Sequence, residues 1–571
     1  MANLLIKNGS VVDGTGAKAF AADVRVRGDK ITEVGANLKA AADERVVDAT
    51  GCVVAPGFIE SHTHFDATMW WQPDMDPLPG YGVTTVIMGN CGFTAAPVPT
   101  DPKVRDEVIG IFSFFEDIPP EPFKQLLPWD WSTWSEYKAS ITANLRTAAN
   151  FSTYLGHIPL RLTVMGMDAW DRAATPDEIK QMCALLEDAL QAGALGLSSN
   201  LMDHDGKGRS VPSLKADEAE WAALMDVLER YPATTLQFIP DTFLRLTALE
   251  KIRWINGILG NRKVRVQIAG LIPAQKFQEK QIPALMELRE ELRAQGKDIW
   301  AGYGHTPTAS VINIRMSLIF AQSGDFVWHE IVTATSDAER ERLLRDADWR
   351  ARARDSWDNK LHPQGLFHMP ERLILFDSEN RAGPLNVRLT DFAKELGVHP
   401  SDAMAEWFLR NGLSSTIDVE PMPLVDEVIT KLFADPLSVG NISDTPAHGQ
   451  MFCGAGRNML LFTTYMKERG MLTLEQAVHV QTGKLAQHFN LNEIGEIKAG
   501  KQADIAVFNL DEIAMRDMHK INDVPDGKGG HIWRWTRPAA PMRLTLVKGE
   551  PTFENGAFTG NLPGTLLSPA V

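Results

Sequence analysis

Two histidines one residue apart, His62 and His64, directly follow an apolar run that reads from Cys52 to Ile59. In an extended strand, side chains at i and i+2 point to the same face, so both imidazoles can be aimed at one point. Imidazole is a common ligand of divalent metals. The apolar run is typical of a turn leading into a buried strand, and (β/α) barrels keep their active sites at the carboxyl ends of such strands. An isolated His-x-His would instead favour two ordinary histidines, so the rest of the chain has to decide.

The elements that would position this pair follow an α/β pattern. Short strand patterns separated by Gly and Asp fill residues 3–56, and a similar pattern returns after residue 495, so we expect both chain ends to pair in one small β domain, 1–56 plus 490–571. Between them, apolar strands alternate with helices, which predicts a parallel sheet closed into a barrel over residues 57–489. The expected strands lie near 82–89, 160–166, 194–199, 233–239, 264–269 and 298–303. The expected helix 176–192 begins after the N-cap Thr175 and ends at Gly193.

Residues 306 to about 400 break this alternation. A helix is expected over 336–345, and much of the remainder has a loop-like composition. Four large aromatic residues, Trp328, Trp349, Trp357 and Phe367, supply apolar surface that can be buried, which argues against a disordered linker. We therefore expect an insertion that covers the mouth of the barrel.

Composition excludes several classes of protein. A formal net charge of −16 over 571 residues argues against nucleic acid or an anionic membrane as the main partner, and favours a small-molecule substrate. Four cysteines are too few for a disulfide framework, and no basic segment followed by a long apolar stretch begins the chain, so a reducing cytoplasm is expected. The sequence has no apolar stretch of membrane-spanning length, and it leaves a homo-oligomer open.

Several motifs together resemble the amidohydrolase superfamily. They are 54–64 with the His-x-His pair, 82–86, 440–444 and 497–504. The segments 89–92, 156–161 and 192–198 resemble its D-aminoacylase branch, the N-acyl-D-amino-acid deacylases. The resemblance implies a TIM-like (β/α)8 barrel flanked by a small β-sandwich made of both chain ends, in agreement with the pattern above.

The resemblance also implies a set of metal ligands. His62 and His64 would come from the first barrel strand, Cys91 from the second, and Asp444, as ligand and general base, from the last. D-aminoacylases carry a ligand histidine on each of two central strands, where this chain has Gln237 and Gln267. Because amides are poor zinc ligands compared with imidazole, we expect at most one divalent metal, Zn²⁺ in the first place, with Mn²⁺ or Fe²⁺ as alternatives.

Further residues are candidates for catalysis or substrate binding. Asp444 would take the proton of an activated water, and His448, four residues later, would polarise the carbonyl or bind a substrate carboxylate. The competing interpretation of His448 is a loop hydrogen bond. Substrate contacts are expected from His157, His305, Arg457 and Gln237, with His305 as a possible replacement for a missing ligand and Arg457 as a carboxylate clamp.

These observations predict a metal-dependent hydrolase of an amide-type C–N bond, with N-acyl amino acids as the substrates that the resemblance implies. Three alternatives stay open. The missing histidines are compatible with a changed reaction, such as lactone hydrolysis, decarboxylation or C–C cleavage. The barrel would otherwise be a non-catalytic scaffold, or would bind small molecules without turnover.

Overall fold

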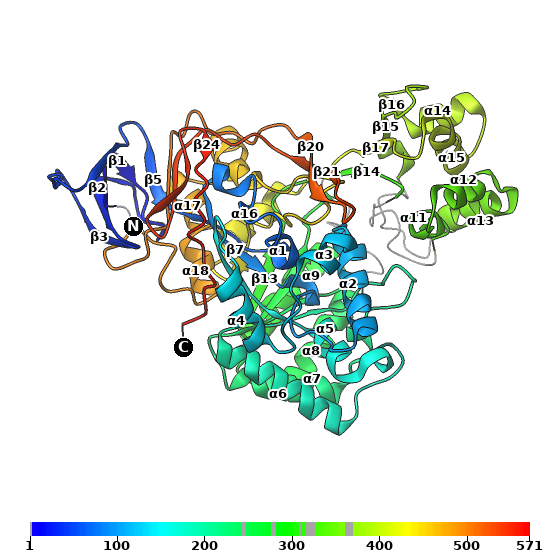
Figure 1. The fold of residues 1–571 in the computed structure, drawn as a ribbon, viewed down its shortest axis with the longest axis horizontal. Helices are drawn as coiled ribbons and strands as arrows, with labels where there is room; N and C mark the ends of the chain where they lie inside the picture. Colours follow the sequence, from blue (N-terminus) through cyan, green and yellow to red (C-terminus); the bar gives the residue numbers. More distant parts are fainter. Residues whose placement is uncertain are drawn as a thin grey trace.

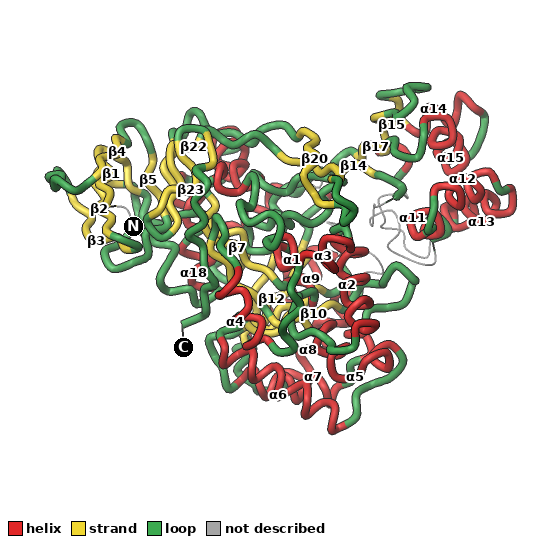
Figure 2. The backbone as a smooth tube through the Cα atoms, viewed as in Figure 1, coloured by secondary structure: helices red, strands yellow, loops and turns green. Residues whose placement is uncertain are grey.

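The computed structural model describes residues 3–242, 247–275, 281–307, 310–315, 326–359 and 369–570. It is a mixed α/β protein whose central strands are surrounded by helices, with a β-rich region on one side and a smaller helical unit on the other (Figure 1 and Figure 2). None of the helices in these ranges is long and apolar enough to cross a membrane.

The central strands run parallel in sequence order. Three of them, β6, β7 and β8, form one sheet, and β9, β10, β11, β12, β13 and β18 form a second. Their bounds are β6 Phe58–Glu60, β7 Val83–Met88, β8 Asn150–Thr153, β9 Leu155–Gly156, β10 Gly196–Asn200, β11 Thr235–Ile239, β12 Arg265–Leu271, β13 Ile299–Tyr303 and β18 Ser438–Val439. A parallel bridge between His62 and Ile442 places the segment after β18 beside the segment after β6. The carboxyl ends of the first and last of these strands therefore meet.

Helices follow most of these strands along the chain. They are α1 Phe65–Thr68, α2 Pro102–Glu116, α3 Pro120–Leu126, α4 Trp134–Asn144, α5 His157–Met165, α6 Pro176–Ala192, α7 Glu218–Glu229, α8 Ala248–Leu259, α9 Gln281–Ala294, α16 Asp426–Ala434, α17 Leu474–His479 and α18 Gly483–His488, with a π-helix over Leu461–Glu468. Helix α6 has the predicted bounds, because Thr175 and Glu178 form a capping box and Gly193 ends the helix with φ 103°.

One predicted strand is wrong. Residues 160–165 lie in helix α5, Gly166 begins the 3-10 helix Gly166–Trp170, and the preceding strand is β8 with its continuation β9. A short apolar run does not distinguish a buried strand from a buried helix by its periodicity alone. The strands predicted near 82–89, 194–199, 233–239, 264–269 and 298–303 are present as β7, β10, β11, β12 and β13.

A nine-stranded sheet joins the two chain ends. Its strands are β1 Asn3–Val11, β2 Phe20–Arg27, β3 Lys30–Gly35, β4 Arg45–Asp48, β5 Val53–Pro56, β19 Ile505–Phe508, β22 Met542–Val547, β23 Glu550–Glu554 and β24 Ala557–Phe558. The junction is the antiparallel pair of β5 with β19, in which Val54 faces Val507. A hydrophobic cluster built from residues between Leu4 and Leu546 lies against this sheet.

A separate unit with its own hydrophobic cluster spans residues 310–419. It contains β14 Ser310–Ile312, α11 His329–Thr333, α12 Asp337–Arg345, α13 Ala347–Asp358, β15 Leu373–Asp377, β16 Val387–Arg388, α14 Leu389–Leu396, α15 Pro400–Asn411 and β17 Thr416–Val419. The unit projects from the body of the protein (Figure 1). Its cluster includes residues of α15 and β17 up to Val419, beyond residue 400 where the insertion was expected to end. Trp328, Trp349 and Trp357 lie in the cluster as predicted, whereas Phe367 falls outside the described residues.

A hairpin, β20 His519–Pro525 with β21 His531–Thr536, lies between this unit and the central strands (Figure 1). Its Trp535 N–H donates to the Gly449 carbonyl at 2.7 Å, which fixes the hairpin beside the loop that follows β18.

Candidate metal centre

Three loops that follow parallel strands carry the expected metal ligands. His62 and His64 follow β6, Cys91 follows β7 and Asp444 follows β18. Cys91 and Asp444 have left-handed backbones, with φ 56° and 63°. Non-glycine residues adopt this conformation rarely, and such residues are concentrated at functional sites.

The donor atoms of these residues converge. His62 Nε2 lies 3.2 Å from Cys91 Sγ and 3.7 Å from Asp444 Oδ1. His64 Nε2 lies 3.3 Å from the same Asp444 oxygen. One ligand atom from each of His62, His64 and Cys91 lies within 4.8 Å of the other two, which is close enough for the three to hold an ion. Two imidazoles, a thiol and a carboxylate match the ligand preferences of zinc.

Burial sets the ionisation of these groups. It lowers the pKa of His62 to about 4, so the ring is neutral and can act as a ligand at neutral pH. It raises the pKa of the Cys91 thiol, reinforced by the charges of Glu116 and Asp444. For Asp444, burial acts in the same direction but is outweighed by the hydrogen bond and charge of His64 and by the charge of His62, so the pKa stays below its usual range. Asp444 is therefore ionised and able to bind a cation.

Glu116, the last residue of α2, was not predicted and belongs to this cluster. Its Oε1 lies 3.5 Å from His64 Nδ1, and one of its oxygens forms a second possible ligand group with His64 and Asp444. Burial, with the charges of Asp444 and Asp203, raises the pKa of Glu116. Buried carboxylates crowded in this way are relieved by a bound cation. The sequence signal was an acidic residue directly after the apolar stretch Ile111–Phe115.

His448 lies beside this acidic group. Its Nδ1 is 2.7 Å from Asp117 Oδ2, and its Nε2 is 3.7 Å from Asp444 Oδ2 and 3.9 Å from Glu116 Oε2. Burial would lower the pKa of His448, but the hydrogen bond and charge of Asp117 and the charge of Asp444 raise it. His448 thus lies at the edge of the ligand cluster and is oriented by Asp117, a residue that sequence reasoning missed.

The two central-strand glutamines differ in their contacts. Gln237 in β11 accepts a hydrogen bond from the Cys91 backbone N–H at 3.3 Å. The oxygen Oε1 of Gln267, the neighbour of Gln237 in β12, accepts a hydrogen bond from His488 at 2.8 Å. Neither is part of a possible ligand group among the described residues.

Arg457 and His305 lie together. Burial lowers the pKa of His305 to about 4, and its Nε2 donates to the Arg457 carbonyl at 3.2 Å. His305 thus contacts the Arg457 backbone and is in no possible ligand group of the described residues. The Arg457 guanidinium lies over the Phe452 ring at 4.7 Å. Burial lowers the pKa of Arg457, and the negative charge of Asp444 acts in the opposite direction.

His157 lies in a different place from the one expected. It begins helix α5, and its Nε2 is 2.8 Å from Glu220 Oε1 while its Nδ1 is 2.9 Å from Ser199 Oγ. Arg161 pairs with the other oxygen of Glu220, and this whole group is fully buried. Both ring nitrogens of His157 are therefore engaged in the core, which leaves no ring atom for a substrate.

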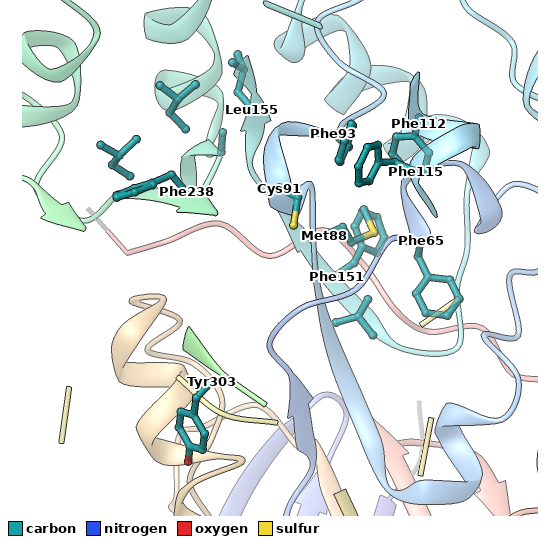
Figure 3. Packing of buried hydrophobic residues seen from close by; sticks show 14 of the residues in the cluster. Phe65, Met88, Cys91, Phe93, Phe112, Phe115, Phe151, Leu155, Phe238 and Tyr303 are labelled. Carbon is teal, nitrogen blue, oxygen red and sulfur yellow. The ribbon is translucent and has the colours of Figure 1, made fainter. Parts of the chain in front are cut away.

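Aromatic side chains pack beside the cluster. Phe93 contacts both Phe112 and Phe115, with centroid distances of 6.0 and 5.3 Å, and the Cys91 sulfur points away from this group (Figure 3). His64 contacts Phe112 edge-on at 6.1 Å. This apolar packing shields the donor atoms from water on one side.

Comparison with known proteins identifies the family of this chain. A model of the amidohydrolase family matches residues 45–553. An N-acyl-D-aspartate deacylase of Alcaligenes xylosoxydans xylosoxydans is 26% identical over 523 residues, which cover 89% of this chain and 86% of the relative. The crystal structure of a D-aminoacylase is 24% identical, with a TM-score of 0.64 and full coverage of both chains. An N-acyl-D-glutamate deacylase from Bordetella bronchiseptica, complexed with zinc and a phosphonate inhibitor that mimics the tetrahedral intermediate, is 21% identical with a TM-score of 0.65 over 99% of each chain.

The chain belongs to the amidohydrolase family, and it is similar to deacylases and D-aminoacylases within it. It is a metal-dependent hydrolase of a C–N bond other than a peptide bond. The resemblance noted in the sequence is thereby confirmed.

Proposed function

We propose that this protein is a deacylase of N-acyl-D-amino acids that uses one divalent metal, zinc in the first place. The observation that carries the proposal is the convergence of His62, His64, Cys91 and Asp444 from three strand ends. When bound there, the ion would activate a water molecule and polarise the acyl carbonyl. Zinc is named in the solved deacylase complex, and the donor set of this chain fits it.

The remaining roles fall to residues around the cluster. Asp444 would accept the proton of the attacking water, because it is ionised and adjoins both histidines. His448, held by Asp117, would pass a proton to the departing amine. Arg457 would bind the carboxylate of the amino acid, since a planar guanidinium matches a carboxylate in two hydrogen bonds.

The surrounding architecture supports this assignment. We propose that the parallel strands from β6 to β18 form a (β/α)8 barrel over residues 57–489, with the sheet of both chain ends as a small β-sandwich domain of residues 1–56 and 490–571. The His62–Ile442 bridge supports closure of the barrel. The 310–419 unit would cover the mouth, since its Val311 N–H donates to the Met451 carbonyl near His448. The free state of all four cysteines supports a cytoplasmic location.

A panel of N-acetyl D- and L-amino acids, assayed for free amine by mass spectrometry together with metal analysis, tests the proposal. Release of the amine from D-substrates by zinc-loaded protein is the expected result. Formation of carbon dioxide or an aldehyde would show that the site has changed its reaction. A protein that retains no metal and releases no amine after zinc or manganese is added would contradict the proposal.

A further inference from the structure

In the Gln237 side-chain amide, the oxygen accepts a hydrogen bond but the nitrogen has no partner among the described residues. Its Oε1 accepts the Cys91 backbone N–H at 3.3 Å, which settles the orientation of the amide. The Nε2 therefore points the other way. This atom is buried and has no hydrogen-bond partner among the described residues.

The position of this amide is next to the ligand cluster. Cys91, whose N–H binds Gln237, has its sulfur 3.2 Å from His62 Nε2. Gln237 is completely buried in the middle of β11, so its backbone is fixed by strand pairing on both sides. The amide is thus held rigidly in contact with Cys91, which is one of the proposed metal ligands.

Burying an amide N–H without a hydrogen-bond partner is unfavourable, because the group loses its bond to water and gains none in return. The neighbouring strand shows the structural alternative. Gln267, paired in register with Gln237, accepts hydrogen bonds from His488 and Tyr154, and its Nε2 is not among the unpaired atoms. The loop after β7 also has a second anchor, because Ser198 Oγ accepts the Gly92 N–H at 3.1 Å. Anchoring the loop therefore does not explain the free Nε2.

We propose that Gln237 Nε2 is an oxyanion donor, which binds the acyl oxygen of the substrate as negative charge develops on it. The inference rests on the proposed amide hydrolysis. As the oxygen of water bonds to the acyl carbon, the π electrons of the carbonyl move to its oxygen, where the Gln237 N–H donates. The proton of the attacking water passes to Asp444. When the C–N bond breaks, the carbonyl re-forms and the amine nitrogen takes a proton from His448, which the proton held by Asp444 replaces. A preorganised donor in a water-poor site stabilises this charge more than it stabilises the planar amide.

Gln237→Met tests this role, because methionine has a similar length and no donor. Ser198→Ala is the matched control, since it removes the other anchor of the same loop and leaves the Gln237 donor in place. Each protein is analysed for bound zinc, for kcat and KM on the best substrate of the panel, and for affinity towards methylphosphonamidates of D-aspartate and D-glutamate. These probes mimic the tetrahedral intermediate, and the free amino acids serve as product ligands.

Gln237→Met is expected to keep its zinc and its KM but to lose kcat by about 10²-fold, with a similar loss of phosphonamidate affinity and little change in product affinity. Ser198→Ala should keep most of its kcat. A wild-type kcat in Gln237→Met, equal weakening of phosphonamidate and product, or an equal loss in Ser198→Ala would overturn the inference.

Failure of the proposed function is a separate outcome. It would appear as a wild-type protein that releases no amine from any N-acyl amino acid. The role of Gln237 would then be tested only by comparing phosphonamidate affinity between wild type and Gln237→Met. A wild-type protein that binds neither of the two phosphonamidates would overturn this inference as well.

Discussion

Replacing Glu60 with glutamine should remove a pH-dependent destabilisation of the fold. Glu60 is the last residue of β6, is 0% exposed, and neither of its carboxylate oxygens has a hydrogen-bond partner within normal geometry in the described structure. Burial raises the pKa of Glu60 from 4.5 to about 8, against smaller lowering effects of Ser443 and Arg457. Glu60 therefore stays protonated in the folded protein at pH values where the unfolded chain has lost the proton.

The sign and size of the effect follow from linkage. Below pH 4.5 both states hold the proton and Glu60 contributes no pH dependence. As pH rises from 4.5 towards about 8, only the unfolded state releases it, so the free energy of unfolding falls. At about 1.4 kcal/mol per pH unit, the total over this interval is roughly 5 kcal/mol.

Urea unfolding of wild type and Glu60→Gln at matched zinc content, repeated across this pH interval, measures the difference. The variant should gain on the wild type with increasing pH, and the gap should level off above pH 8. Difference infrared spectroscopy should also show a protonated carboxyl in the wild type that is absent in the variant. A gap that does not change with pH would refute the reasoning, because it would mean that Glu60 ionises normally in the fold.

Other expectations concern the metal centre. His62→Ala should lose both zinc and turnover. Asp444→Asn should lose turnover by about 10²–10⁴-fold but should keep part of its zinc. Metal analysis together with kinetics distinguishes the two variants, and full activity in Asp444→Asn would reject Asp444 as the base. Glu116→Gln should weaken zinc binding by about 10–100-fold, measured by competition with a chelator, because the carboxylate adjoining a ligand histidine orients the ring; unchanged affinity would place Glu116 outside the site. Chelation should lower the midpoint of thermal unfolding, and zinc should restore it. At a zinc concentration a hundredfold above Kd, binding should add about 3 kcal/mol to the free energy of unfolding. An unchanged midpoint in calorimetry would mean that no site exists.

The parts of this structure that the sequence predicted are those with a local signal. Helix α6 was predicted to the residue because its capping box and terminal glycine lie within the helix and its flanks. His62 and His64 were predicted as a pair from their i, i+2 spacing in an extended strand. In the structure β6 ends at Glu60, and both histidines reach the site from the segment that follows it. Residues 160–166 were misassigned because an apolar run of this length is too short to distinguish a strand from a helix.

The parts that were missed depend on contacts between distant segments. Glu116 joins the cluster only because α2 ends beside the loops after β6 and β18, and nothing near it in sequence indicates that meeting. His157 was expected to contact substrate, but Glu220, 63 residues further on, occupies its Nε2 in the core. A sequence can show which residues are able to do chemistry; the fold decides which of them are already committed elsewhere.

The bridge between His62 and Ile442 has a consequence for how the protein matures. During synthesis, His62, His64 and Cys91 leave the ribosome long before Asp444. The nascent chain therefore carries an incomplete set of the proposed metal ligands for most of its translation. An ion captured by the full set would link the earliest and latest parts of that chain, and the free energy of its capture would be folding free energy. Zinc supply would then limit the yield of native enzyme as well as its activity.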